Sequence, residues 1–292
     1  MASVAILGVG KMGAAMAREL ASAGHQVLLW NRTIERALLV SEAIDNPQVS
    51  VATTIAEAIA ASDFALSLFA NGEITESMLL SDPAIVANSP SDYVFVDMGT
   101  SGINVAHSLA GRICAAGRRF VDAPVSGSMA TIASHQLLVL ASGDESAVEL
   151  IRPALLSFSK KVSYLGKAGA GQAMKLSINL VVHSLNAALA QALALATSSG
   201  IDPALAYDLF EESVIAAPFV KYKRSAFLDA STPVAMRIDT TVKDLGLIFD
   251  FARSKEIDSE AIAALQNLYI HACDGGFADQ DMASLVRFLQ KE

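Results

Sequence analysis

Lys175 could do acid–base chemistry, because of both its residue type and its position. It lies just inside the start of a helix predicted over about 171–198, where the helix dipole and the apolar neighbours both disfavour an ammonium ion. A lysine with its pKa lowered toward neutrality can give or take the proton of an alcohol or carbonyl group. Asn179 follows on the same helix face and could orient the lysine or the reacting oxygen. The alternative is a solvated lysine near a helix end.

A glycine-rich turn near the N-terminus could bind phosphate groups. Gly8-Val9-Gly10-Lys11-Met12-Gly13 directly follows an apolar strand predicted over 4–7 and opens a helix that ends at Gly24. Gly8 allows a tight turn, Gly10 lets the backbone approach a pyrophosphate, and Gly13 lets helix and strand pack closely. An isolated motif of this kind is often an ordinary turn. The flanking helix and a second strand at 26–30 favour dinucleotide binding here, with Lys11 and Met12 in the same loop.

The end of the second strand indicates which dinucleotide binds. Asn31-Arg32-Thr33 holds no acidic residue that would accept hydrogen bonds from a ribose 2′-hydroxyl and repel a 2′-phosphate. Arg32 offers a permanently charged fork, so we expect NADP(H) to be preferred over NAD(H). The alternative is a solvated surface arginine. Phe69 and Ala70 end another strand, at the sheet edge where the cofactor is expected.

Composition limits the classes of function. A chain of 292 residues with 53% apolar residues predicts two domains, and a net charge of −9 with only 21 Lys and Arg argues against nucleic-acid and anionic-membrane partners. Cys114 and Cys273 are far apart, which predicts neither a disulfide framework nor a metal site. No targeting pattern precedes the first strand, so we expect a cytoplasmic location.

Strand and helix signals divide the chain into two parts. Apolar runs at 4–7, 26–30, 64–68, 93–96 and 137–140 alternate with Ala-rich helical stretches, which predicts a doubly wound, mostly parallel α/β sheet. After Gly171 only helical patterns remain, at about 171–198, 203–213, 242–254, 259–275 and 282–289. We therefore expect a nucleotide-binding domain over 1–165 and an all-helical domain over 166–292.

The helix predicted over 171–198 is apolar enough to imitate a membrane span. Its polar residues Asn179, His183, Asn186 and Gln191 favour a helix buried in protein instead, with His183 a hydrogen-bonded core residue. A helix that is apolar on most sides needs protein around it. We expect a homodimer or homotetramer.

Three further motifs complete a recognisable pattern. They are Asp122-Ala123-Pro124-Val125-Ser126-Gly127-Ser128, Gly169-Ala170-Gly171-Gln172-Ala173-Met174-Lys175 with Asn179, and Lys243-Asp244-Leu245, which is expected to begin a helix. Together with the N-terminal glycine loop they resemble the β-hydroxyacid dehydrogenase family, which includes 3-hydroxyisobutyrate dehydrogenase and semialdehyde reductases. The resemblance spans nearly the whole chain and implies an N-terminal Rossmann domain followed by an all-helical C-terminal domain.

The resemblance also implies roles for individual residues. Lys175 matches the catalytic lysine and Asn179 its partner, Ser126 and Gly127 match a turn that binds the substrate carboxylate, and Thr100 matches a threonine placed against cofactor and substrate. Lys243 matches a lysine that reaches the cofactor; without the family, a surface Lys-Asp pair would be the simpler reading. Gly99 and Ser128 depart from the family's usual serine and glycine.

The expected function is therefore an NADP-dependent oxidoreductase that interconverts a small 3-hydroxy acid and its semialdehyde, or reduces a related small aldehyde acid. An imine reductase on the same scaffold is one alternative, although that branch typically replaces the lysine. A non-catalytic, cofactor-sensing module is another. Replacing Lys175 separates these readings.

Overall fold

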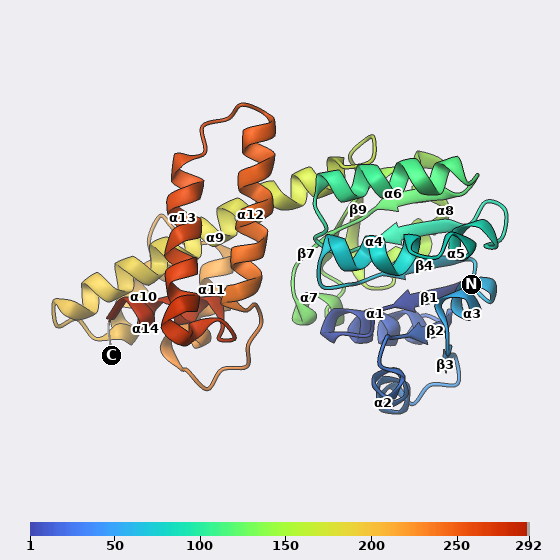
Figure 1. Ribbon diagram of the computed structural model, residues 1–292. Coiled ribbons are helices and arrows are strands. Elements are labelled where there is room, and N and C mark those ends of the chain that lie inside the picture. The colour runs from blue at the N-terminus through green and yellow to red at the C-terminus, as the bar shows by residue number, and fades with distance from the viewer. Residues whose placement is uncertain (291–292) are drawn as a thin grey trace. The chain divides into compact units, whose positions relative to one another are not determined.

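The first part of the chain is built around a nine-stranded sheet (Figure 1). Its strands are β1 (Ser3–Leu7), β2 (Gln26–Trp30), β3 (Val49–Val51), β4 (Phe64–Ser67), β5 (Val94–Asp97), β6 (Arg119–Asp122), β7 (Val125–Ser126), β8 (Leu137–Gly143) and β9 (Ser159–Tyr164). The computed structural model describes residues 1–290.

The strand order is β3-β2-β1-β4-β5-β6-β8-β7, with β9 paired to β8. All pairs from β3 to β6 are parallel, whereas β8 runs antiparallel to β6 and β7. The order reverses at β1, where the chain leaves toward β2 and later returns on the other side as β4. The predicted doubly wound sheet is thus confirmed. The short β3 and the lysine-containing β9 escaped prediction because neither is an apolar run.

Helices cover both faces of the sheet. Residues of β1 alternate between two cores: Val4 and Ile6 pack on one face, Ala5 and Leu7 on the other. The first face is covered by α1 (Lys11–Ser22), α2 (Ile34–Ile44), α7 (Met129–Ala133) and α8 (Glu145–Leu155). The second is covered by α3 (Ile55–Ala60), α4 (Gly72–Leu80), α5 (Pro83–Ala87) and α6 (Ile103–Ala115).

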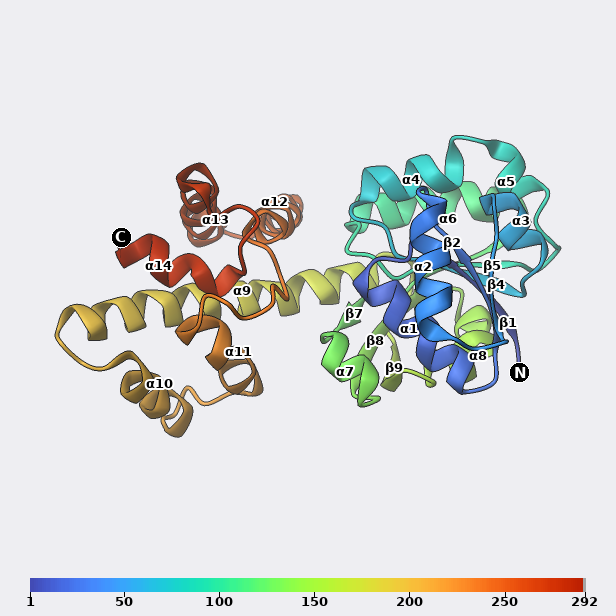
Figure 2. The same cartoon turned by 90° about the horizontal axis from the view of Figure 1, so that it is seen from below.

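The remaining described residues, up to Gln290, form helices and their connections, as predicted. Their elements are α9 (Ala170–Ser198), α10 (Pro203–Glu212), α11 (Pro218–Leu228), α12 (Ile238–Ser254), α13 (Glu260–Ala272), η1 (Cys273–Phe277), η2 (Met282–Ser284) and α14 (Leu285–Gln290). Figure 2 shows α10 and α11 on one side of α9 and α12 and α13 on the other. The helix α11 was not expected, because Lys221, Lys223 and Arg224 interrupt its apolar positions. Its buried Lys223 forms a 2.6 Å ion pair with Asp281.

Two expected boundaries differ from the structure. The chain divides into compact units Met1–Lys175 and Leu176–Glu292, because the first turns of α9 pack with the sheet. The expected domain boundary at 165 lies ten residues earlier. The helix α12 begins at Ile238, so Lys243 and Asp244 lie in its second turn; the expectation that this pair begins the helix was wrong.

One helix among residues 1–290, α9, is long and apolar enough to cross a membrane by length and composition. The mean hydropathy of its most apolar 18-residue window is 1.5, and 33% of that window is buried. Within a single chain, α9 is thus covered on only part of its circumference.

Candidate functional site

The glycine loop joins β1 to α1 in the conformation that phosphate binding needs. Gly8 has φ +103°, and a Cβ there would lie 2.7 Å from the carbonyl oxygen of Leu68; a Cβ on Gly13 would lie 2.2 Å from the Gly8 carbonyl oxygen. No atom lies within 4 Å of a Cβ position on Gly10. The first turn of α1 carries neither a side-chain cap nor an acidic residue. Its N-terminus is therefore suited to a pyrophosphate.

The end of β2 is tied to this loop. Gly8 N–H donates to the Trp30 carbonyl, and Val9 N–H donates to Asn31 Oδ1 at 3.3 Å, while Asn31 Nδ2 donates to the Thr33 carbonyl at 2.9 Å. Asn31 therefore orders the loop, a role that sequence reasoning did not foresee. Thr33 directly precedes α2 and is exposed.

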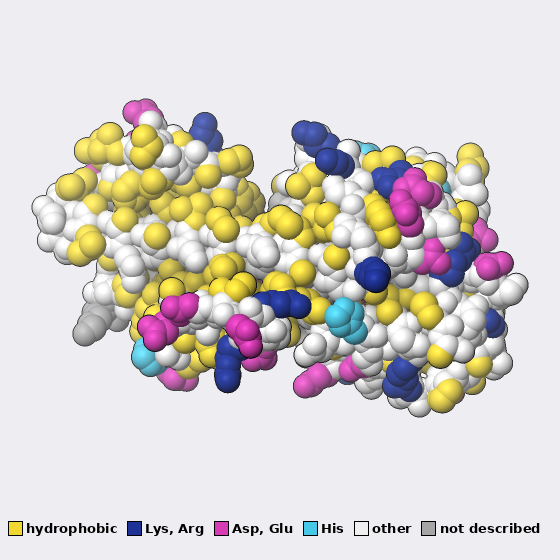
Figure 3. Space-filling view, turned by 90° about the horizontal axis from the view of Figure 1, so that it is seen from above, with side chains coloured by type: hydrophobic (Ala, Val, Ile, Leu, Met, Phe, Trp, Pro, Cys, Tyr) yellow, Lys and Arg dark blue, Asp and Glu magenta, His cyan; other side chains and the backbone are white. Residues whose placement is uncertain are grey.

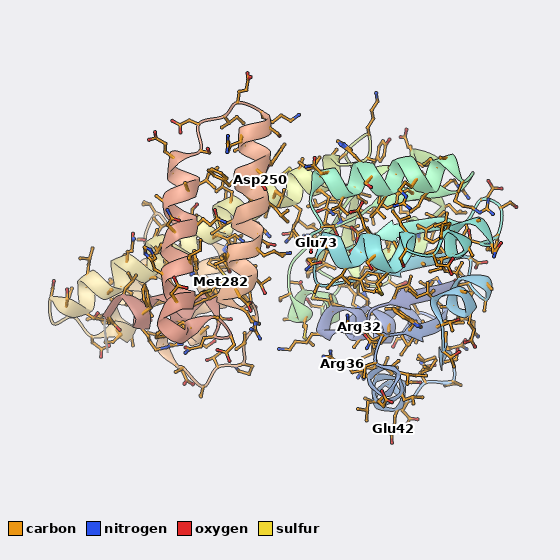
Figure 4. All side chains as sticks on the ribbon, in the orientation of Figure 1. Arg32, Arg36, Glu42, Glu73, Asp250 and Met282 are labelled. Carbon is orange, nitrogen blue, oxygen red and sulfur yellow. The ribbon has the colours of Figure 1, made fainter. Side chains whose placement is uncertain are left out.

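Two arginines project from the junction of β2 and α2 (Figure 4). Arg32 is exposed, as expected for a group that meets a ligand, and Arg36 lies one turn later in α2 and is also exposed. No hydrogen bond or ion pair engages either guanidinium within residues 1–290. Arg36 was missed because only Asn31, Arg32 and Thr33 were considered at the end of the second strand. Its spacing of four residues from Arg32 was the available signal.

The carboxyl ends of β4 and β5 lie beside the glycine loop. Phe69 follows β4; its ring meets Trp30 edge-on at 6.3 Å between centroids and lies 3.3 Å from a Cβ position on Gly8. Gly99 follows β5, and its Cβ position lies 3.4 Å from the Phe69 carbonyl oxygen. Thr100 is half-buried next to it, and Ala70 is exposed. The structure thus groups Gly8, Phe69 and Thr100 at one sheet edge, which is where open parallel sheets bind ligands.

A buried network fixes the start of α9 to that edge. Asp122, at the end of β6, accepts hydrogen bonds from Gly169 N–H at 2.9 Å, from Gln172 N–H at 3.1 Å and from the Ser142 hydroxyl at 2.6 Å. Ser142 Oγ in turn accepts from Gly171 N–H. These bonds satisfy N–H groups that a helix start leaves unpaired. Desolvation raises the pKa of Asp122, and its hydrogen bonds offset part of that effect.

Gln172 extends the network to the loop that carries Thr100. Its fully buried side chain accepts from Ser101 and Gly102 N–H at 3.2 Å each and donates to the Gly99 carbonyl at 2.9 Å. We call Asp122, Ser142 and Gln172 the helix brace. The brace joins the Thr100 loop to the helix that carries Lys175, three residues beyond Gln172. No pattern in the sequence indicated this network.

A second buried carboxyl group lies under the same loop. Asp97 is fully buried at the end of β5 and accepts from Gly99 N–H at 3.2 Å and from the Ser67 hydroxyl at 3.3 Å, while its Oδ2 has no hydrogen-bond partner within the described residues. Burial raises the pKa of Asp97 to about 6. Gly99 stands where the family usually has serine, and here its N–H donates a hydrogen bond to the Asp97 carboxyl group.

The turn after β7 is closed by a threonine. Gly127 has φ +145°, and a Cβ on it would lie 2.2 Å from Thr131 Oγ1. Ser128 N–H donates to Thr131 Oγ1 at 2.7 Å, and the Thr131 hydroxyl donates back to the Ser128 carbonyl. Ser126 is half-buried and pairs with Leu138 in the sheet. The Ser128 N–H is therefore engaged within the protein by Thr131.

Lys175 is half-buried and lies in the second turn of α9, not the first, so the helix dipole acts on it less than its expected place at the helix start implies. Asn179, one turn later, is buried and its Nδ2 donates to Asp244 Oδ2 at 2.8 Å. A carboxylate only accepts hydrogen bonds, so the amide orientation is fixed.

Lys243 is half-buried with its Nζ 2.9 Å from Asp244 Oδ1. Asp244 is itself buried, so the pair is not the surface pair that a sequence-only reading would assume.

The structure thus places the predicted site residues in two groups. The first unit brings the glycine loop, Phe69, Thr100 and the start of α9 to one edge; the second holds Asn179 with Lys243 and Asp244. Among residues 1–290 no group of three or more His, Cys, Asp or Glu side chains could hold a metal ion.

Two known domain families match this chain, and together the two matches cover it nearly end to end. The NAD binding domain of 6-phosphogluconate dehydrogenase matches residues 3–166, and the NAD-binding region of NADP-dependent 3-hydroxyisobutyrate dehydrogenase matches residues 169–289.

Individual proteins show the same relationship. Glyoxylate/succinic semialdehyde reductase 2, chloroplastic, of Arabidopsis thaliana is 28% identical over 99% of this chain and 79% of its own length. Glyoxylate/succinic semialdehyde reductase 1 of the same plant is 27% identical over 97% of this chain and 96% of its own. A Mycobacterium tuberculosis 3-hydroxyisobutyrate dehydrogenase structure with L-serine superposes with a TM-score of 0.84, at 26% identity and 99% coverage of both chains.

Proposed function

Because the chain belongs to the β-hydroxyacid dehydrogenase family and is an NAD-binding oxidoreductase of the hydroxy-acid and semialdehyde type, we propose that it is an NADP-dependent reductase of a small aldehyde acid. The same site would oxidise the corresponding hydroxy acid, a 3-hydroxy acid where the substrate is a 3-oxo acid. The observation that carries this proposal is the helix brace, which fastens the helix of Lys175 to the Thr100 loop at the ligand-binding edge of the sheet.

The residues at this edge fit a dinucleotide. The uncapped N-terminus of α1 and the open position at Gly10 suit its pyrophosphate, with Lys11 and Met12 alongside. Phe69, Ala70 and Thr100 would border its nicotinamide half. When bound, NADP(H) supplies or accepts the hydride. The chain's own residues then have to bind the substrate, orient it and move one proton.

Lys175 is the proposed proton donor to the carbonyl oxygen during reduction, and the proton acceptor during oxidation. Asn179 supports this role through its fixed amide. Because Nδ2 points at Asp244, the acceptor Oδ1 is the atom left to orient an ammonium or hydroxyl group on the Lys175 face of α9. Lys243, by its ion pair with Asp244, holds the carboxylate that fixes this amide; its contact with the cofactor stays a prediction.

The substrate carboxylate is assigned to the Ser126–Gly127 turn, where a hydroxyl and backbone N–H groups can bind an anion. Ser128 N–H is held by Thr131, so the Ser126 hydroxyl and the remaining backbone N–H groups of the turn would bind the anion. The relatives support a small acid: both plant reductases are named for glyoxylate and succinic semialdehyde, and the mycobacterial structure holds L-serine.

The preference for NADP(H) rests on charge. Arg32 and Arg36 place two exposed guanidinium groups at the end of β2, and no acidic residue stands at 31–33 to bind a ribose hydroxyl. A 2′-phosphate would be bound by both arginines.

A homodimer or homotetramer is also proposed. In the single chain α9 leaves Val181 at 66% and Leu195 at 69% exposure, and α10 leaves Leu205 and Leu209 more than half exposed. Figure 3 shows hydrophobic side chains gathered on one face of this helical part. A depression of about 700 Å³ at the end of α9 is lined by Ala194, Leu195 and Leu289, among others. Exposed apolar area on this scale favours a protein partner, and a second copy is the simplest one.

The activity is tested by following absorbance at 340 nm with NADPH and with NADH. The substrates are glyoxylate, succinic semialdehyde and tartronate semialdehyde, with 3-hydroxyisobutyrate and NADP⁺ or NAD⁺ for the reverse direction. We expect turnover of at least one acid, with NADPH giving the higher kcat/KM. A cyclic imine is the matched control. Turnover of the imine without turnover of any aldehyde acid would overturn the proposal.

A further inference from the structure

His183 is a buried histidine that the proposed mechanism does not use. It lies on α9 one turn after Asn179 and is 0% exposed. Neither Nδ1 nor Nε2 has a hydrogen-bond partner within residues 1–290, which contradicts the expectation of a hydrogen-bonded core histidine. Leaving a buried polar ring unpaired is costly, so such a group calls for an explanation.

The acceptor facing the ring is the carboxylate that fixes Asn179. His183 Nε2 lies 3.7 Å from Asp244 Oδ2, the same oxygen that accepts the Asn179 Nδ2 hydrogen bond. That separation is longer than a hydrogen bond, yet both side chains are almost completely buried, so bulk solvent screens their attraction only weakly. Asp244 of α12 thus contacts two residues of α9, Asn179 and His183.

Within residues 1–290, the other polar groups near the ring form no hydrogen bond with its nitrogens. From α13, the Tyr269 hydroxyl donates to the His183 backbone carbonyl at 3.3 Å and accepts from Asn186 Nδ2 of α9. From α12, Lys243 pairs with Asp244 Oδ1, on the other oxygen of the carboxylate. Burial would raise the pKa of Asp244, but His183 and Lys243 outweigh burial and lower it.

We propose that His183 is a positioning residue of the proposed reaction: its Nε2–H attracts Asp244 Oδ2 electrostatically and so holds the carboxylate that orients the Asn179 amide toward Lys175. The inference rests on the proposed function only for its effect on turnover. The coupling between His183 and Asp244 itself does not depend on any activity.

A double-substitution cycle tests the effect on turnover. His183→Leu removes both ring nitrogens and is expected to lower kcat for the aldehyde acid about tenfold with KM for NADPH unchanged, whereas His183→Gln keeps a donor and restores part of the rate. With Asn179→Ala already present, His183→Leu should change kcat by less than about twofold. Equal losses in both backgrounds would show an independent structural role and overturn the proposal, as would full activity of His183→Leu.

A second measurement needs no turnover. The ¹⁵N chemical shifts of the His183 ring are measured by NMR in the wild-type protein and in Asp244→Asn, and Lys243→Met serves as the variant to use if Asp244→Asn does not fold. Because Nε2 is the nitrogen that faces the carboxylate, either substitution should change the Nε2 shift more than the Nδ1 shift. Ring nitrogen shifts that are identical in these proteins would overturn the pairing. If the coupling is present but no acid is turned over, the proposed function fails and the pair stands.

Discussion

At the residue scale, the account depends on a few side chains whose charge decides their role. Arg32 and Arg36 are exposed cations beside the cofactor loop, Lys175 is a half-buried amine, and Asp97 and Asp122 are buried carboxyl groups at adjacent strand ends. Sequence alone could single out Lys175 and Arg32, because type and local spacing suffice there. It could not single out Asp97 or Asp122, because their importance comes from burial and from partners distant in the sequence.

The cofactor preference is a residue-scale prediction. Arg32→Asp places a carboxylate where a 2′-phosphate would bind, so kcat/KM with NADPH should fall by roughly one hundredfold, with the value for NADH unchanged or higher. Arg36→Asp should act in the same direction with a smaller loss. Steady-state kinetics with both cofactors measure this. Arg253→Asp, an exposed arginine on α12, is the charge-matched control; an unchanged preference in Arg32→Asp would contradict the assignment.

The buried Asp97 predicts a pH dependence of stability. Its folded-state pKa is about 6 against an ordinary 3.8. Between these values the folded protein keeps a proton that the unfolded chain has released, so the free energy of unfolding falls as pH rises. Asp97→Asn removes this loss, and its stability relative to wild type should grow from pH 4 to pH 7 by up to roughly 3 kcal/mol.

Urea unfolding at several pH values measures this difference. Asp250→Asn, at an exposed carboxylate of α12, is the control and should show no such trend. A stability difference between Asp97→Asn and wild type that stays constant from pH 4 to pH 7 would argue against a protonated Asp97.

At the scale of elements, local patterns predicted more than long-range contacts did. The strands β1, β2, β4, β5 and β8 and the helices α9, α10, α12 and α13 follow from apolar periodicity. The helix α11 was missed, and α12 begins four residues before its predicted start. The helix brace was not predictable, because Asp122 and Gln172 are 50 residues apart and their bonds exist only once β6 and α9 are packed together.

Breaking the helix brace should affect turnover more than it affects cofactor binding. Gln172→Ala deletes three hydrogen bonds to the Thr100 loop, so kcat should fall by roughly tenfold or more, with a smaller change in the dissociation constant for NADPH. Gln172→Glu keeps the acceptor for Ser101 and Gly102 and should retain more activity. Stopped-flow turnover and fluorescence titration separate the two effects. Equal losses in cofactor binding and turnover would indicate general loosening of the first unit.

At the scale of the whole molecule, the apolar surface of α9 predicts self-association. Light scattering at micromolar concentration should give a mass of at least twice 30.5 kDa. Leu195→Glu places a charge on that surface and should shift the protein toward the monomer. Leu39→Glu is the matched control, since Leu39 on α2 is 64% exposed against 69% for Leu195. A wild-type monomer would refute the expected oligomer.

The central claim is that Lys175 moves the substrate proton, and one comparison tests it most directly. NADPH affinity and aldehyde-acid turnover are measured side by side in wild type, in Lys175→Ala and in Lys161→Ala, an exposed lysine of β9. The account predicts that Lys175→Ala binds NADPH within about twofold of wild type while kcat falls by roughly 10³, and that Lys161→Ala matches wild type in both. Undiminished turnover in Lys175→Ala would contradict it.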